Sequence, residues 1–230
     1  ANYPRFTGEP SVFHRGLYAK IAEFGVKFEG KSVVDIGCGT GVHTLFLAQI
    51  CREITGMDIS GEMLKVMVED AAKFNISNLT AVQSDFKNFN PNRVYDVAFS
   101  TMSPAIADEE DFVKFINLGK KRVYLWWNKP RYSSVLELFY EGSQRGCFKE
   151  KANFFEEYLR RENIAFNSCV LEEFREQKRT LEEMTQNALW HLQIANFTYD
   201  ENTIRSRLES IAQDGFVTEK IVSSMKLLVF

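Results

Sequence analysis

The stretch Val33-Val34-Asp35-Ile36-Gly37-Cys38-Gly39-Thr40-Gly41 decides the fold of this 230-residue chain. A short run rich in β-branched residues leads into three alternating glycines, and apolar residues at helical spacing follow over 42–50. This order predicts a buried strand, a tight turn and a helix. Glycines suit a turn whose backbone must approach a ligand closely, and the start of the helix offers free N–H groups at the same place.

The same alternation of apolar runs and helical patterns continues on both sides of this stretch. We expect a first helix over 17–26, then strands at 32–36, 53–59, 79–82, 94–100 and 122–127, and further helices at 42–50, 63–74 and 108–118. Strands that alternate with helices predict a mostly parallel sheet with helices on both faces. The fold class is therefore α/β and doubly wound.

The alternation weakens after residue 127. We predict helices at 133–140, 153–161, 181–192 and 203–212, and strands at 166–174 and 221–230. Because no linker rich in Pro, Gly or Ser interrupts the chain, we expect one domain over 1–230. Within it we expect an N-terminal cap and helix (1–30), a cofactor-binding core (31–128), and substrate-side and lid helices with the last two strands (129–230).

Composition restricts the partners and the compartment. The chain has 28 basic and 31 acidic residues, a net charge of −3, which does not favour nucleic acid as a partner. No apolar run reaches the roughly 20 residues that span a bilayer, so we expect no membrane association. The 4 cysteines form no C-x-x-C pair, so we expect neither a metal site nor a disulfide framework. We expect a cytoplasmic monomer or homodimer, and the absence of Met at Ala1 leaves open further residues before it.

Two ligand classes use a strand, a glycine turn and a helix in this order. Dinucleotide binders prefer G-x-G-x-x-G, whereas the pattern here is G-x-G-x-G and Val42 follows it. Asp58, at the end of the second predicted strand, is placed to accept hydrogen bonds from both hydroxyls of a ribose. Val42 and the lack of a Tyr-x-x-x-Lys pair disfavour a nicotinamide-dependent oxidoreductase.

The glycine pattern, with Asp35 two residues before its first glycine, resembles motif I of class I S-adenosylmethionine-dependent methyltransferases. Segments 56–64, 83–86 and 95–100 resemble the next three motifs of that family, in the same order. The resemblance covers about 35–105. It implies a Rossmann-like, seven-stranded sheet whose last strand is antiparallel, with S-adenosyl-L-methionine as cofactor and S-adenosyl-L-homocysteine as product.

The resemblance also implies roles for individual residues. Asp35 would orient the glycine loop and the methionine amino group, Asp58 would bind the ribose, and Asp85 would meet the adenine amino group. The cofactor-binding set that it implies is Asp35, Gly37, Cys38, Gly39, Thr40, Gly41, Asp58, Ile59, Met63, Asp85, Phe86, Ser100 and Met102.

The methyl acceptor is not readable from the sequence. Ser103-Pro104 matches half of a motif carried by relatives that methylate amino groups, but Ala105 and Ile106 depart from it, which disfavours methylation of a nucleobase. A sulfonium methyl is already activated, so transfer needs mainly alignment and exclusion of water, and we assign no catalytic residue. We interpret His43 and Trp190 as packing residues. The substrate candidates are Tyr3, Ser103, Pro104, Trp127, Asn128 and Arg131.

The leading hypothesis is methyl transfer to a small molecule. A non-catalytic S-adenosylmethionine-binding regulatory module and methylation of a protein or nucleic acid remain alternatives. Residues 1–16 and 133–192 are expected to cover the acceptor pocket, with Phe154, Phe155, Tyr158 and Trp190 supplying the apolar surface.

Overall fold

The computed structural model describes residues 4–140, 150–195 and 197–230, and its chain forms two compact units. Unit 1 comprises residues 1–126, 151–170 and 226–230, and unit 2 comprises residues 127–150 and 171–225. The division of residues 1–230 into one domain with three parts stays a prediction.

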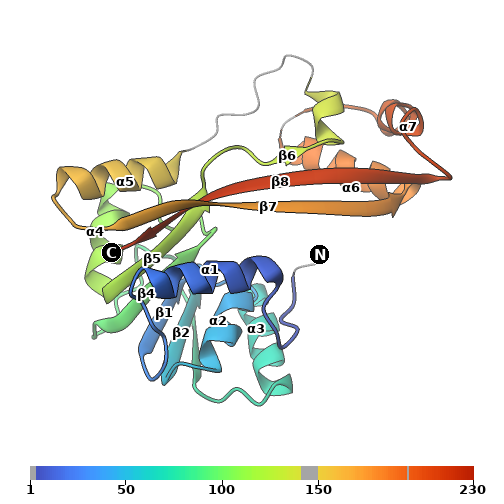
Figure 1. Ribbon diagram of the computed structural model, residues 1–230. Helices are drawn as coiled ribbons and strands as arrows, with labels where there is room; N and C mark the ends of the chain where they lie inside the picture. The colour runs from blue at the N-terminus through green and yellow to red at the C-terminus, as the bar shows by residue number, and fades with distance from the viewer. Residues whose placement is uncertain (1–3, 141–149, 196) are drawn as a thin grey trace. The chain divides into compact units, whose positions relative to one another are not determined.

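The helices and strands follow one another along the chain as Figure 1 labels them. The helices are α1 (Val12–Glu23), α2 (Val42–Ala48), α3 (Gly61–Lys73), α4 (Glu109–Leu118), the 3-10 turn η1 (Leu136–Phe139), α5 (Lys151–Arg161), α6 (Leu181–Ile194) and α7 (Glu201–Glu209). The strands are β1 (Ser32–Ile36), β2 (Glu53–Asp58), β3 (Leu79–Gln83), β4 (Tyr95–Thr101), β5 (Gly119–Trp127), β6 (Tyr132–Ser133), β7 (Asn167–Thr180) and β8 (Phe216–Val229).

The sheet confirms the predicted α/β fold. Its strand order is β3-β2-β1-β4-β5-β8-β6, and β7 also pairs with β8. The first five strands are mutually parallel, whereas β8 runs antiparallel, as the reciprocal backbone hydrogen bonds between Arg122 and Phe230 show. The sheet has eight strands rather than the expected seven because the two-residue β6 adds to it.

Helices cover both faces of the parallel strands, which explains why β1 is buried along its whole length. On one face, Val34 and Ile36 of β1 pack in a core with Phe112 of α4 and Phe155 of α5. On the other side, α2 and α3 contribute Leu45, Leu64, Met67 and Ala71 to a second cluster. A strand covered on both faces requires continuous apolar sequence, which is the pattern that β1 shows.

Two expected helices differ from the structure, and the last two strands are longer than expected, since β7 continues to Thr180 and β8 begins at Phe216. Helix α1 begins at Val12 rather than near Leu17, because the Ser11 hydroxyl accepts a hydrogen bond from the His14 N–H and caps the helix start. The helix expected at 133–140 is only the short turn η1. Ser133 is drawn into β6 beside Ile221, and its hydroxyl accepts the Leu136 N–H that opens the turn.

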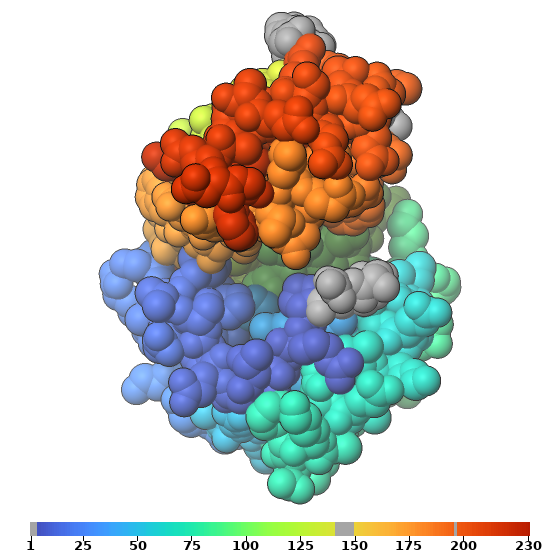
Figure 2. Space-filling model, turned by 90° about the vertical axis from the view of Figure 1, so that its right-hand side faces the viewer, coloured from blue at the N-terminus to red at the C-terminus, as the bar shows by residue number. Residues whose placement is uncertain are grey.

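Residues 4–11, expected to be an irregular flap, are packed against α3 and the glycine turn. The Arg5 guanidinium forms two hydrogen bonds to the buried Asp70 carboxylate, at 2.6 and 2.9 Å. Phe6 is 4% exposed and meets the ring of Phe74 edge to face. Figure 2 shows this dark-blue segment against the turquoise surface of α3. The segment is therefore held by tertiary contacts and not by secondary structure of its own.

The apolar face of α5 and the position of Trp190 correct two expectations. Phe155 and Tyr158 were expected to close an acceptor pocket, but both belong to the core of unit 1, where Phe155 stacks on Phe112. Trp190 was interpreted as core and is 58% exposed. The core of unit 2 is formed by residues of η1, α6, α7 and β8, among them Phe139, Met184, Leu208 and Val217.

Candidate functional site

The site lies where the strand order reverses, between β1 and β4. In open α/β sheets this reversal creates a crevice at the carboxyl ends of the strands. Two cavities occur here, both lined by unit 1 alone. The larger cavity, about 630 Å³, is bounded by the ends of β2, β3 and β4. The smaller cavity, about 240 Å³, lies along the glycine turn, and the two share Gly37 and Met63.

The glycine turn fits tightly against the segment that follows β4. Gly37 has φ +71°, and a Cβ built there would lie 1.7 Å from the Ser103 hydroxyl oxygen, so no larger residue fits. The N–H groups of Gly37 and Cys38 both donate to the Met57 carbonyl, at 2.8 and 3.0 Å. The turn is thereby hydrogen-bonded to β2 on one side and leaves no room for a side chain beside Ser103 on the other.

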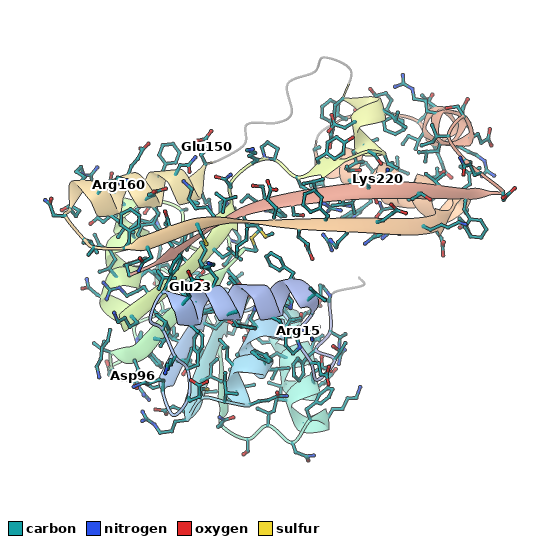
Figure 3. All side chains as sticks on the ribbon, in the orientation of Figure 1. Arg15, Glu23, Asp96, Glu150, Arg160 and Lys220 are labelled. Carbon is teal, nitrogen blue, oxygen red and sulfur yellow. The ribbon has the colours of Figure 1, made fainter. Side chains whose placement is uncertain are left out.

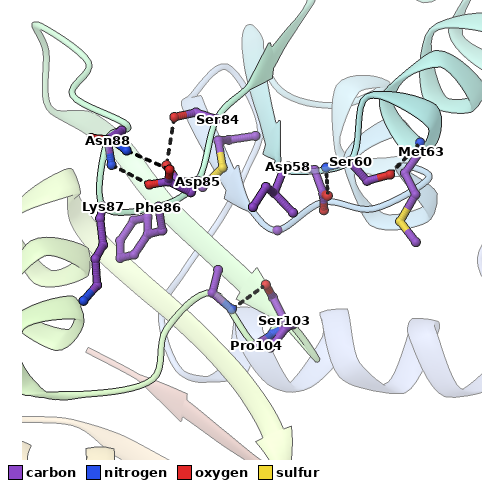
Figure 4. A pocket seen from close by; sticks show the side chains of 14 residues that line it. Asp58, Ser60, Met63, Ser84, Asp85, Phe86, Lys87, Asn88, Ser103 and Pro104 are labelled. Atoms are coloured by element: carbon purple, nitrogen blue, oxygen red, sulfur yellow. Dashed lines mark hydrogen bonds between the residues drawn. The ribbon is translucent and has the colours of Figure 1, made fainter. Parts of the chain in front are cut away.

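Asp58 ends β2 and fixes the glycine turn to the start of α3. Its two carboxylate oxygens accept one N–H each, from Gly39 at 2.8 Å and from Ser60 at 2.9 Å. A carboxylate offers about four acceptor positions, so two remain for a ligand. Asp58 lines the larger cavity beside Ser60 (Figure 4). The geometry suits an acceptor for a pair of hydroxyl groups.

Asp85 and Phe86 form the opposite wall of the larger cavity. The Asp85 carboxylate accepts the backbone N–H and the side-chain amide of Asn88, at 2.8 and 2.7 Å. These hydrogen bonds lower the pKa of Asp85, so it is ionised at neutral pH. Phe86 is 4% exposed and belongs to the core, so its ring position is fixed. The wall combines an anionic acceptor with a rigid apolar surface.

Asp35 is the penultimate residue of β1 and faces the smaller cavity. Its carboxylate is buried and accepts a hydrogen bond of 2.6 Å from the Thr44 hydroxyl. Burial raises the pKa of Asp35 to about 7, although the Thr44 hydrogen bond opposes this effect. Asp35 therefore changes charge near neutral pH, and a cation in the cavity would favour its ionised form.

His43 also lines the smaller cavity and was not among the predicted site residues. Its Nδ1 lies 2.7 Å from the Tyr18 hydroxyl, and its ring meets that of His14 at a centroid distance of 4.5 Å. Burial, with a smaller contribution from His14, lowers the pKa of His43 to about 3, and burial raises the pKa of Tyr18. Both groups are therefore neutral at physiological pH. Tyr18 lies 25 positions earlier in the chain, so no local pattern could indicate this pair.

Lys151 holds the segment that follows β4. This residue is 7% exposed, and its ammonium group donates to the carbonyls of Pro104 and Ile106, at 3.0 and 3.4 Å. It also lies 4.8 Å from the centre of the Trp126 ring. Because Ser103 and Pro104 line the larger cavity, Lys151 positions one wall of the site without lining it.

The structure brings together most, but not all, of the predicted site residues. Ile59, Met63, Ser103 and Pro104 line the larger cavity, and Cys38, Gly39, Thr40 and Met102 line the smaller one. Ser100 and Gly41 line neither: Ser100 is fully buried and donates to the Ile36 carbonyl, and Gly41 caps α2. Trp127, Asn128 and Arg131 belong to unit 2, and Tyr3 lies outside the described residues. The lining residues outside the predicted set are Pro4, Val42, His43, Met57, Ser60, Ser84, Lys87, Asn88, Thr101 and Ala105. Met57, Ser60 and Ser84 lie within segments that resemble the family motifs.

The described part of the chain contains neither a cluster of metal-binding side chains nor a long apolar helix. Within residues 4–140, 150–195 and 197–230, no group of three or more His, Cys, Asp or Glu could hold a metal ion. Among these residues there is also no helix with the length and apolar character needed to cross a bilayer.

Comparison with known proteins points to one family. The family description "Methyltransferase domain" matches residues 33–119. A pavine N-methyltransferase from Thalictrum flavum subsp. glaucum is 30% identical over 40% of this chain and 26% of its own length. A ribosomal RNA small subunit methyltransferase G from Photobacterium profundum is 29% identical over 38% of this chain and 42% of its own length. The chain thus spans less than half of either relative.

The fold is shared with solved structures of low sequence identity. A coclaurine N-methyltransferase, bound to N-methylheliamine and SAH, superposes with a TM-score of 0.52. The match covers 99% of this chain and 75% of that chain, at 13% identity. At this identity the likeness extends to the fold alone.

Proposed function

We propose that the protein transfers a methyl group from S-adenosylmethionine to a small-molecule acceptor, since residues 33–119 match the description of a methyltransferase domain. The main support for the proposal is that the two cavities share Gly37 at the point where the strand order reverses, between β1 and β4. An elongated ligand with a nucleoside at one end and an amino acid at the other suits this pair of cavities.

The residues present fit such a donor. In the larger cavity, Asp58 has two acceptor positions left for ribose hydroxyls, and Asp85 with Phe86 offers an acceptor and an apolar wall for adenine. In the smaller cavity, the Asp35 carboxylate suits the methionine ammonium group. When bound, the donor supplies a methyl group already activated by its sulfonium. What remains for this chain is to align the reactants and exclude water.

A small acceptor is favoured over a nucleic acid by charge. The net charge is −3, and a protein that binds a nucleic acid polymer usually presents a basic face. The similarity to a plant N-methyltransferase of pavine supports the same choice, whereas the ribosomal RNA methyltransferase relative makes RNA the alternative to test.

Donor binding is tested by isothermal titration calorimetry with S-adenosylhomocysteine. Asp58→Ala should weaken binding about tenfold to a hundredfold, since a hydrogen bond to a charged group contributes about 1.5–3 kcal/mol. Glu62→Ala, which removes an exposed carboxylate from the first turn of α3, is the matched control and should bind like the parent.

Because Asp58 also holds the glycine turn, a second ligand separates ribose binding from loop structure. An analogue of S-adenosylhomocysteine without the ribose hydroxyls should bind the parent and Asp58→Ala with similar affinity. An equal loss for both ligands would contradict the ribose assignment.

The acceptor class is tested by measuring S-adenosylhomocysteine formation with a metabolite extract and, separately, with total RNA. We expect product with the metabolites. Product with RNA only would refute the small-molecule acceptor. Donor binding without product from either fraction would favour a non-catalytic binding module.

A further inference from the structure

Unit 2 contains three buried polar atoms without a hydrogen-bond partner among the described residues. They are Arg131 Nε, Glu219 Oε2 and Ser223 Oγ. Glu219 and Ser223 are each 1% exposed. Folded proteins pair nearly all buried polar groups, so a cluster of unpaired ones requires an explanation, such as a ligand that completes them.

Glu219 and Ser223 belong to β8, and Arg131 immediately precedes the neighbouring strand β6. β6 and β8 are antiparallel, with Ser133 opposite Ile221, and the same register places Arg131 opposite Ser223. Side chains alternate along a strand, so Arg131, Ser223 and Glu219 share the face of Ser133. The Ser133 hydroxyl accordingly donates to the other Glu219 oxygen, Oε1, at 2.5 Å. One Glu219 oxygen is thus satisfied and the other is not.

The charges on this face are not balanced by internal ion pairs. Arg175 and Glu173 pair with each other at 3.3 Å. Within the described part of the chain, Arg131 and Glu219 form no ion pair, although the charge of Glu219 acts on the Arg131 guanidinium. Glu219 is therefore a buried anion, and Arg131 is a half-buried cation whose Nε is inaccessible to water, and neither has an ion-pair partner among the described residues. A buried charge left unpaired is costly, so both groups favour a ligand of opposite charge.

His191 of α6 belongs to the same cluster. It is half-buried, and burial, followed by the charge of Arg131, lowers the pKa of its imidazole. A neutral imidazole adds hydrogen-bonding capacity without adding charge. The charge of Arg179, whose guanidinium donates to the Gln177 side chain, also acts on Arg131 and His191. Apart from the Arg175–Glu173 pair, the face therefore carries two cationic groups, the anionic Glu219 and several neutral polar groups.

We propose that this face of unit 2 binds a small zwitterion of the α-amino-acid type, with its carboxylate on Arg131 and its ammonium group on Glu219. A simple anion would leave Glu219 Oε2 unpaired, and a simple cation would leave Arg131 unpaired. A zwitterion pairs with both, and the planar guanidinium suits a carboxylate. The inference goes beyond methyl transfer, because it concerns binding by unit 2 and does not depend on the cavities of unit 1.

The test is a titration of the full chain with each of the twenty amino acids, followed by calorimetry. At least one should bind with one-to-one stoichiometry. For the tightest ligand, N-acetylation and amidation of the carboxylate should each weaken binding to the parent about tenfold or more. In Glu219→Gln, N-acetylation should have no further effect, and in Arg131→Gln, amidation should have none.

Lys220→Gln is the matched control, because Lys220 is an exposed residue of β8 (Figure 3). It follows Glu219 directly in the strand, so its side chain lies on the opposite face. It should bind like the parent. If a charge variant fails to fold, Ser223→Ala removes only an unpaired hydroxyl and should still weaken binding. The proposal is overturned if none of the twenty amino acids binds the parent. It is also overturned if N-acetylation weakens binding to Glu219→Gln, and amidation weakens binding to Arg131→Gln, as much as each weakens binding to the parent. It is also overturned if Asp58→Ala abolishes binding while Glu219→Gln does not, since the ligand would then occupy unit 1.

Discussion

The buried Asp35 carboxylate should make the stability of the protein depend on pH in a defined direction. Its pKa is about 7 in the folded chain, against 3.8 as the ordinary value. Between these pH values the folded state holds a proton that the unfolded state has lost. Stability therefore falls as pH rises through this window, and the loss is complete above about pH 7.

The magnitude follows from the width of the window. One pKa unit corresponds to about 1.4 kcal/mol, so ionising Asp35 in the folded state costs about 4 kcal/mol by pH 8. Asp35→Asn keeps the shape and an acceptor for the Thr44 hydroxyl but cannot ionise. Relative to the parent, this variant should gain up to about 4 kcal/mol in free energy of unfolding between about pH 4 and pH 8.

His43 produces a pH dependence of the opposite sign in the parent. Its pKa is lowered to about 3 in the folded state, so the unfolded state binds more protons below the ordinary value, 6.5. Its contribution to stability therefore rises with pH between about 3 and 6.5. Stability falls with pH because of Asp35 and rises with pH because of His43, so the two effects partly cancel in the parent. The informative quantity is therefore the difference in unfolding free energy between Asp35→Asn and the parent. The contribution of His43 is the same in both proteins and cancels in this difference.

The assay is urea unfolding of both proteins at several pH values, followed by tryptophan fluorescence. Thr44→Val provides a companion, because it removes the hydrogen bond that favours ionised Asp35. Thr44→Val should raise the pKa of Asp35 in the folded state by about one to two units, so the pH at which the loss of stability is complete should rise by the same amount. If the difference in unfolding free energy between Asp35→Asn and the parent is the same at pH 4 and pH 8, the reasoning is refuted.

Three further outcomes concern the walls of the site. Gly37→Ala should abolish binding of S-adenosylhomocysteine in calorimetry, because the added Cβ would lie 1.7 Å from the Ser103 oxygen and the backbone has φ +71°. Gly39→Ala should retain more affinity, because a Cβ there has only Met63 within 4 Å. Lys151→Met should lower the free energy of unfolding by about 1–3 kcal/mol, since it leaves the Pro104 carbonyl without its buried donor; an unchanged urea midpoint would contradict this. Deletion of residues 1–8 leaves the Ser11 cap of α1 intact but removes Arg5 and Phe6 from Asp70. The truncated protein should melt at a lower temperature and bind S-adenosylhomocysteine more weakly, and equal affinity would show that the segment does not close the smaller cavity.

Sequence alone determined the elements that depend on local chemistry. The β-branched run before Gly37 predicts a buried strand, and β1 has the predicted bounds, 32–36. The glycines at 37, 39 and 41 all adopt positive φ, a conformation that other residues rarely take. Asp58 ends its strand at the edge where the glycine turn lies, because parallel strands bring their carboxyl ends together.

Only the tertiary structure decided which surfaces and side chains meet. The periodicity of α5 shows an apolar face but not its partner, and that face packs on Phe112 rather than over an acceptor. The Asp58 contact to Gly39, the Tyr18 contact to His43 and the Glu219 contact to Ser133 join residues 19, 25 and 86 positions apart. The ionisation of Asp35 depends on burial by distant elements as well. Sequence patterns report the preferences of neighbouring residues, whereas contacts and dielectric environment arise only once the chain has folded back on itself.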